Sequence, residues 1–362
     1  MKRLAAMGLI LAMAVGLAGC KGGEAVSQTK RAENTASEGK KESEDVSGEE
    51  EAETTKAVEE ADGETVNLKV SHVFAETHPV HQAYLRASGE LYEKTGGRYQ
   101  LTIFANGTYG NYADSITACQ MGTLDITCLD SASDWLESGG VLFAPYCFDS
   151  YEHWRTFKES ELCSEMREEI GKAVGGVRQL NMYNFGFRNL TANKEIRTLE
   201  DFNGLTLRCV NFEPYSTLKD VFRVAITSIP IEDVYMSLQT GVADCQENPV
   251  TQIVTMKFYE VQKYLIMTRH MLACSSTIIN EKLWDSLSDE DRAIFEEVFL
   301  NMGDYVDQMV VENEATLIEE CVMNGMTLLE DIDTAPFQEN ARQVVADYPA
   351  WQDWYSQIQE MK

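Results

Sequence analysis

Two arginines lie in apolar stretches of this sequence, and they are the first candidates for chemistry. Arg188 stands in F-G-F-R-N-L, and Arg208 stands in G-L-T-L-R-C-V. A guanidinium is seldom buried alone, so each arginine either pairs with a buried carboxylate of the protein or awaits the carboxylate of a ligand. Its planar fork matches a carboxylate with two parallel hydrogen bonds. Two such arginines in one chain favour an anion-binding site.

An asparagine before a proline is the third candidate. Asn248 stands in Q-E-N-P, directly before Pro249. The residue before a proline is biased toward an extended backbone, which suits a side-chain amide that faces a cleft. The alternative is a structural role, in which Asn248 is the N-cap of a helix whose first residue is Pro249. The residues alone leave both interpretations open.

Metal, phosphate and nucleophile motifs give no comparable signal. His78 and His81 are three residues apart, but no third ligand follows at the spacing of a zinc motif. The sequence contains neither a phosphate loop of the G-x-x-x-x-G-K-[ST] type nor a G-x-S-x-G or H-E-x-x-H motif. We therefore expect no metal, no cofactor and no enzymatic activity.

The segments that must position the candidate residues alternate between strands and helices. The first strand patterns lie at 66–72, 98–104 and 124–129, and the helical patterns between them lie at 79–94 and 112–121. This alternation predicts a parallel α/β sheet. In such sheets ligands bind at the carboxyl ends of the strands, where polar residues are therefore of interest.

The second half of the chain continues in the same way. Further strands are expected at 177–184, 205–210 and 225–229, and helices near 214–221 and 231–239. The capping box that begins at Ser288 predicts a long helix that runs to about Met323.

The composition excludes some classes of partner. The chain has 362 residues, of which 25% are charged and 44% hydrophobic. Lys and Arg number 30 against 59 Asp and Glu, so the formal net charge is −29. A nucleic-acid partner needs a basic face, and electrostatic docking on an anionic membrane needs one too. We therefore expect neither of these.

The sequence of the N-terminus predicts an export signal. Lys2 and Arg3 precede an apolar stretch at 4–19, which has the length of a signal-peptide core. The stretch ends in Leu-Ala-Gly-Cys20, which resembles the bacterial lipobox, in which the cysteine is acylated. The alternative is a simple cleaved signal with a chance cysteine. Residues 21–64 contain no Leu, Ile, Met or aromatic residue, so we expect a disordered acidic tether.

The cysteines are expected to be free. Eight of the nine follow Cys20, and they are scattered along a chain that is long enough to have a large core. Several stand in apolar runs, and a buried free cysteine behaves as a small hydrophobe. No C-x-x-C motif supports a zinc or redox site.

Five stretches, in order, carry a family resemblance. They are E-K-T-G-G-R (93–98), Q-M-G-T-L-D (120–125), L-E-D-F-N-G-L-T-L-R (199–208), S-L-Q-T-G-V-A-D-C-Q-E-N-P (237–249) and K-F-Y-E-V-Q-K-Y-L-I-M-T-R-H (257–270). Together they resemble the DctP-type solute receptors of TRAP transporters, which are uptake systems driven by an ion gradient. The resemblance covers essentially all of 66–362.

The resemblance implies a fold. That fold is α/β, of the two-domain periplasmic-binding-protein type (a Venus flytrap), with a hinge and one long helix that spans both domains. Domain I would comprise 65–185 with about 274–313. Domain II would comprise 186–273 with about 314–362.

The resemblance also implies a binding site. The ligand carboxylate would be held by the arginine at the position of Arg208, with Arg188 and Asn248 assisting. Ile231 stands where many members have a pocket-lining phenylalanine. The positions implied to contact ligand hydroxyls are His72, Asn111 and Asp130.

The implied function is that of an extracytoplasmic receptor for a small organic acid, with a sugar acid such as a uronate favoured. The receptor would be a monomer, attached to the outer face of a bacterial cell membrane only by lipid on Cys20. It would deliver its ligand to the small and large membrane subunits of a TRAP transporter. The alternatives are a receptor for a sensory system, a binding protein of another importer class, and an enzyme that uses Asp130 and His72 as acid and base.

Overall fold

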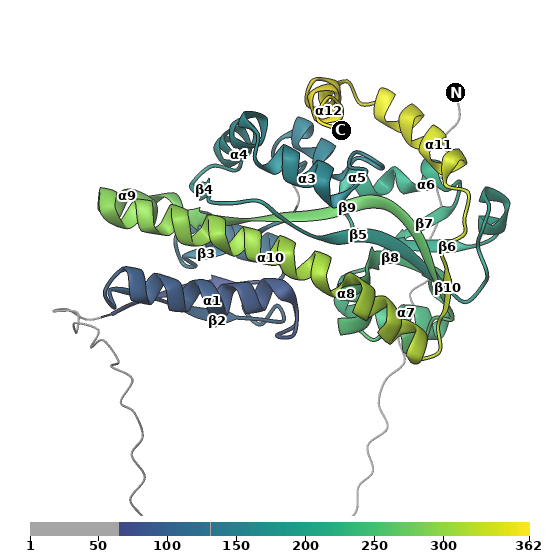
Figure 1. The fold of residues 1–362 in the computed structure, drawn as a ribbon, viewed down its shortest axis with the longest axis horizontal. Helices are drawn as coiled ribbons and strands as arrows, with labels where there is room; N and C mark the ends of the chain where they lie inside the picture. Colours follow the sequence, from purple (N-terminus) through teal and green to yellow (C-terminus); the bar gives the residue numbers. More distant parts are fainter. Residues whose placement is uncertain (1–64, 131) are drawn as a thin grey trace, which may run out of the picture. The chain divides into compact units, whose positions relative to one another are not determined.

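The structure is a computed structural model, and it describes residues 65–130 and 132–362 (Figure 1). The predicted signal peptide with Cys20 and the predicted tether at 21–64 lie outside the described residues.

The described residues form one sheet in the order β2-β1-β3-β9-β5-β8-β6-β7, and β4 and β10 also pair with β9. The strands are β1 (Val66–Ser71), β2 (Tyr99–Phe104), β3 (Ile126–Leu129), β4 (Val177–Gln179), β5 (Tyr183–Ala192), β6 (Thr206–Cys209), β7 (Ala225–Ser228), β8 (Cys245–Pro249), β9 (Tyr264–Asn280) and β10 (Thr327–Leu329).

Parallel pairing lies mainly at the two ends of the sheet, and the short β10 also pairs in parallel with β9. At one end β1 pairs in parallel with β2 and β3, and at the other β6 pairs in parallel with β7 and β8. Between them β9 and β5 pair antiparallel with each other and with their outer neighbours β3 and β8. The α/β class and the parallel pairing of the first three strands are confirmed. The prediction that the whole sheet is parallel is wrong, because the strands at its centre pair antiparallel.

Helices cover the sheet. They are α1 (Pro79–Lys94), α2 (Tyr112–Met121), α3 (Tyr151–Lys158), α4 (Glu161–Val174), α5 (Glu213–Ser216), α6 (Leu218–Val221), α7 (Val234–Thr240), α8 (Val250–Thr255), α9 (Glu281–Ser286), α10 (Asp289–Met323), α11 (Ala335–Ala346) and α12 (Gln352–Gln359). Short 3-10 helices lie at Glu137–Phe143, Leu199–Phe202, Ile231–Asp233, Phe258–Glu260 and Pro349–Trp351.

Local capping explains where the helices begin. Pro79 opens α1, and the His78 ring accepts a hydrogen bond from Val80 N. The Asn111 side chain caps α2, which ends at Gly122 in the left-handed conformation. Ser288 caps α10 as predicted, because its hydroxyl accepts from Asp291 N.

Helix α10 runs across both halves of the sheet (Figure 1). It packs against α1 and β5 and then against α8. Phe295, Phe299 and Val306 point into the core from this helix, and all three are fully buried. The predicted long helix to about Met323 is therefore confirmed.

The predicted domain boundaries fall inside continuous elements. The boundary at 185/186 lies within β5, the one near 273/274 lies within β9, and the one near 313/314 lies within α10. Each of these three elements would connect the two domains. The boundaries themselves stay predictions.

Three apolar clusters fill the interior. The eight cysteines from Cys119 to Cys321 are all buried, and none of them is paired with another cysteine of the described residues. Among the described helices, none combines the length and the hydrophobicity of a membrane span.

Candidate functional site

Arg208 lies on β6, the strand next to the edge strand β7, and is completely buried. It is in register with Thr227 of β7 and Gln246 of β8. Its Nε and Nη2 donate to the carbonyl oxygen of Ile229 at 2.8 and 2.6 Å. Its Nη1 is buried and has no hydrogen-bond partner among the described residues.

No described carboxylate forms an ion pair with Arg208. Burial lowers the pKa of its guanidinium to about 10, and the nearby charge of Glu247 only partly opposes that effect. The guanidinium is still protonated at neutral pH. The site therefore holds a buried cation with an unused donor.

Arg188 has a different environment. It stands on β5 and pairs with the carboxylate of Glu247 on β8; its Nε donates to Oε2, and its Nη2 donates to Oε1 at 2.9 Å. The same Nη2 donates to Glu247 O at 2.7 Å and to Asn248 Oδ1 at 2.9 Å. Burial alone would lower the pKa of Arg188, but Glu247 outweighs it and the pKa is raised. The structural-pair interpretation holds for Arg188.

Asn248 belongs to this network through both atoms of its amide. Its Oδ1 accepts from Arg188, and its Nδ2 donates to Gln246 Oε1 at 2.6 Å. Asn248 lies on β8, and the N-cap residue of α8 is Pro249. The alternative that Asn248 caps a helix is therefore wrong, and the predicted extended backbone is confirmed.

Glu247 and His270 are parts of the site that sequence reasoning missed. Glu247 is fully buried, and His270 Nε2 lies 3.4 Å from its Oε2 without forming a hydrogen bond. His270 Nδ1 lies 2.8 Å from Thr268 Oγ1. Burial disfavours the Glu247 carboxylate, but Arg188 reverses the effect and lowers its pKa. A signal was present, because Glu247 is the acid within Q-E-N-P itself.

Asp130 approaches the arginines from the other parallel unit. It directly follows β3, and its Oδ1 is enclosed without a hydrogen-bond partner among the described residues. Burial raises the pKa of this carboxyl to about 6, although the hydroxyls of Ser275 and Tyr112 and the charge of Arg188 lower it. Asp130 and Arg188 are thus close enough to interact.

Tyr215 links the two sides of the site. The Arg188 guanidinium lies over its ring, with 5.0 Å between the guanidinium carbon and the ring centroid. Burial raises the pKa of Tyr215, and both Glu247 and Asp130 are close enough to contribute. The phenol is therefore neutral, and it is close to both Arg188 and Asp130.

Three histidines lie at the end of β1 and the start of α1. His72 directly follows β1, its Nε2 lies 3.1 Å from His81 Nδ1, and its ring stacks on Tyr84. His78 Nδ1 accepts from Val80 N, so its proton is on Nε2. Burial lowers the pKa of His72 and of His78 to about 3, and both rings are neutral at physiological pH.

Two predicted contacts make their interactions elsewhere. Asn111 is exposed and uses its side-chain oxygen to accept from Asp114 N at 3.0 Å. Ile231 begins a 3-10 helix and packs against the apolar cluster of α7 and α8. Their roles in ligand binding stay predictions, as do those of the other site residues.

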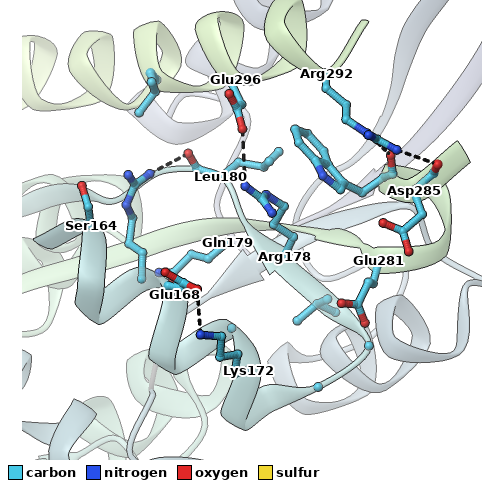
Figure 2. Close-up of a pocket in the computed structure, with 17 residues that line it drawn as sticks. Ser164, Glu168, Lys172, Arg178, Gln179, Leu180, Glu281, Asp285, Arg292 and Glu296 are labelled. Atoms are coloured by element: carbon cyan, nitrogen blue, oxygen red, sulfur yellow. Dashed lines mark hydrogen bonds and ion pairs between the residues drawn. The ribbon is translucent and has the colours of Figure 1, made fainter. Parts of the chain in front are cut away.

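A hollow of about 900 Å³ between α4, β4, α9 and α10 is separate from these residues (Figure 2). Its charged side chains largely satisfy one another. Lys172 pairs with Glu168 at 2.7 Å, and Arg178 pairs with Glu296 at 3.4 Å. None of the predicted site residues lines it, so it is not the candidate site.

Comparison with known proteins places this geometry in a family. The model of the bacterial extracellular solute-binding proteins, family 7 (DctP), matches residues 70–350. A sialic acid-binding periplasmic protein of Vibrio cholerae is 32% identical, over 69% of this chain and 78% of that protein. A 2,3-diketo-L-gulonate-binding periplasmic protein of Escherichia coli is 25% identical, over 78% of this chain and 86% of that protein.

A solved structure agrees. The crystal structure of a TRAP periplasmic solute-binding protein from Roseobacter denitrificans with bound L-galactonate has a TM-score of 0.74 and 28% identity. The match covers 82% of this chain and 98% of that one. The predicted fold class, a two-domain binding protein, and the predicted TRAP receptor family are both confirmed. The chain therefore belongs to family 7 of the bacterial extracellular solute-binding proteins.

Proposed function

We propose that this protein binds a small hydroxylated organic acid outside the cytoplasm and delivers it to the membrane subunits of a TRAP transporter. The observation that carries the proposal is the state of Arg208. It is a fully buried guanidinium with two donors fixed on Ile229 O and a third, Nη1, without a partner in the described chain. A ligand carboxylate would supply the missing acceptor and the compensating charge.

The relatives support the chemical class of ligand. The three proteins compared above are named for sialic acid and 2,3-diketo-L-gulonate or hold L-galactonate, which are all hydroxylated acids. Asp130, His72 and His78 would serve the hydroxyl groups, because each has a buried polar atom without a partner among the described residues. Asn111 and Ile231 would line the remainder of the cleft.

Two roles are assigned to the arginine pair. Arg208 would bind the carboxylate. Arg188, held by Glu247, would support it and would keep Asn248 oriented through the hydrogen bond from Nη2. The domains proposed at 65–185 with 274–313 and at 186–273 with 314–362 would close around the ligand, with bending in β5, β9 and α10.

The proposal includes attachment of the receptor to the membrane by a lipid. Cys20, in Leu-Ala-Gly-Cys, would carry the lipid, and 21–64 would tether the receptor to the outer face of the cell membrane. The receptor would act as a monomer and would transport its ligand without altering it chemically.

The test is a conservative change at the anchor. Arg208→Lys keeps the charge but loses the planar fork, so a loss of about 1.5–3 kcal/mol in binding free energy is expected. Isothermal titration calorimetry with L-galactonate, sialic acid and D-glucuronate would measure this loss of binding free energy. Arg223→Lys is the matched control, since Arg223 is exposed, donates to Asn340 Oδ1 at 3.2 Å and is not a candidate ligand-binding residue. Equal dissociation constants for wild type and a folded Arg208→Lys variant would reject the assignment.

A further inference from the structure

The charges at the candidate site are unequally compensated, and this limits the charge of the ligand. Arg188 is neutralised by Glu247, because both are buried and joined through two of the guanidinium nitrogens. Arg208 has no carboxylate partner among the described residues. The arginine side of the site therefore offers one uncompensated positive charge, although it contains two guanidinium groups.

Among the residues that the structure describes, the opposite side offers no positive charge. Its ionisable groups include Asp130, Tyr112, His72 and His78, and the phenol and the two imidazoles are neutral because burial raises the pKa of Tyr112 and lowers those of the histidines. His81 beyond them is also neutral, because burial lowers its pKa as well. The one formal charge available there is the negative charge of Asp130.

The two sides belong to one site. Tyr215 lies under Arg188 and interacts with Asp130, and Tyr112 contacts both Asp130 and the ring of Phe74. Phe74 in turn stacks on His78, with 4.3 Å between ring centroids. An extended ligand anchored at Arg208 would therefore reach Asp130 and then the histidines.

We propose that the receptor accepts acids with a single anionic group, bound at Arg208, and rejects ligands with a second anionic group at the far end. This inference rests on the proposed function and narrows it to hydroxylated monocarboxylates. A second carboxylate or a phosphate would lie beside the Asp130 carboxylate without a cation to compensate it. In a site closed from water such a pairing of like charges is unfavourable, because screening is weak.

Two matched sets of ligands test the proposal with the full chain. Gluconate and glucuronate each carry one carboxylate on a six-carbon skeleton. Glucarate has the same skeleton with a carboxylate at each end. Galactonate and galactarate form the second set. Isothermal titration is expected to show that a monocarboxylate binds and that the corresponding dicarboxylate binds at least about 30-fold more weakly.

The possible results separate this inference from the proposed function. Binding of a dicarboxylate as tight as, or tighter than, that of its monocarboxylate would overturn the inference and leave the receptor function intact. Failure of every acid to bind, in protein unfolded and refolded to remove retained ligand, would overturn both.

A variant tests the assigned determinant. Asp130→Asn has nearly the same shape and removes the negative charge. The ratio of the dissociation constant of the dicarboxylate to that of the monocarboxylate should therefore fall at least about tenfold. Asp289→Asn is the control, because it makes the same change in net charge at a fully exposed side chain at the start of α10. An unchanged gap in a folded Asp130→Asn variant would show that Asp130 does not set the selectivity.

Discussion

Removing the carboxylate of Glu247 should destabilise the protein strongly. Glu247 has an exposed fraction of 0% and its partner Arg188 one of 3%, so neither charge is solvated by water. In Glu247→Gln the amide can still accept one hydrogen bond, but the Arg188 charge is left uncompensated. Breaking a buried ion pair from one side costs about 3–5 kcal/mol. For a folded part of about 300 residues, with an unfolding entropy of about 2.1 cal/mol/K per residue, that is a decrease in melting temperature of roughly 5–8 °C.

The assay is thermal unfolding at one scan rate, followed by circular dichroism at pH 7, with urea denaturation as a second measure. Glu339→Gln is the matched control, because Glu339 also pairs with an arginine, Arg342, but both side chains are about 60% exposed. Exposed pairs contribute little, so the control should change the unfolding free energy by less than about 1 kcal/mol.

A specific result would refute this reasoning. If Glu247→Gln were as stable as Glu339→Gln, then Arg188 would not depend on Glu247 for its charge compensation. Arg188 would then be a second uncompensated cation, and the argument for a ligand with one anionic group would lose its basis.

Two further predictions concern Asp130 and Cys20. Because the pKa of Asp130 is raised to about 6 in the folded protein, its contribution to stability is complete below about pH 4 and is lost as the pH rises through 6. Asp130→Asn should therefore stabilise the ligand-free protein at pH 7, by on the order of 1–3 kcal/mol, and have little effect at pH 4. Urea denaturation of wild type and variant at pH 7 and at pH 4 would measure this difference in stability. An equal gain in unfolding free energy at pH 4 would contradict the prediction. Cys20→Ser should abolish labelling by radioactive palmitate in the bacterial host and release the receptor from the membrane fraction. Labelling that persists in the variant would exclude Cys20 as the acylated residue.

The sequence predicts the parts of the fold that depend on neighbouring residues. The alternation at the start of the chain, the N-cap at Ser288 and the extended backbone before Pro249 all rest on local sterics and hydrogen bonds. The 17-residue strand β9 was missed, since its apolar run lacks the alternation of a half-buried strand. Its partners β3, β4 and β5 lie far away in the chain, and local patterns do not encode such pairing.

Arg188 and Arg208 show where sequence reasoning about the site stops. Both stand in apolar strands and give the same signal, but one is compensated by the protein and the other is not. The difference depends on Glu247, which is 59 residues from Arg188 in sequence and reaches it through the pairing of β5 with β8. The expected burial could not distinguish the two arginines. Burial follows from the position of each arginine in an apolar strand, and it does not show whether a carboxylate of the protein lies beside the guanidinium.

This difference also suggests how the roles in the site are divided. The pair of Arg188 and Glu247 ties β5 to β8, and Arg188 Nη2 also donates to Asn248 Oδ1 and so holds that side chain in place. Such a pair positions the neighbouring side chains but offers no net charge to a ligand, because its two charges neutralise each other. Arg208 is held on Ile229 O by neutral hydrogen bonds that fix its orientation and leave its charge intact. A receptor that must release its ligand gains from this arrangement, since one ion pair to the ligand has to be broken and the framework around it does not change.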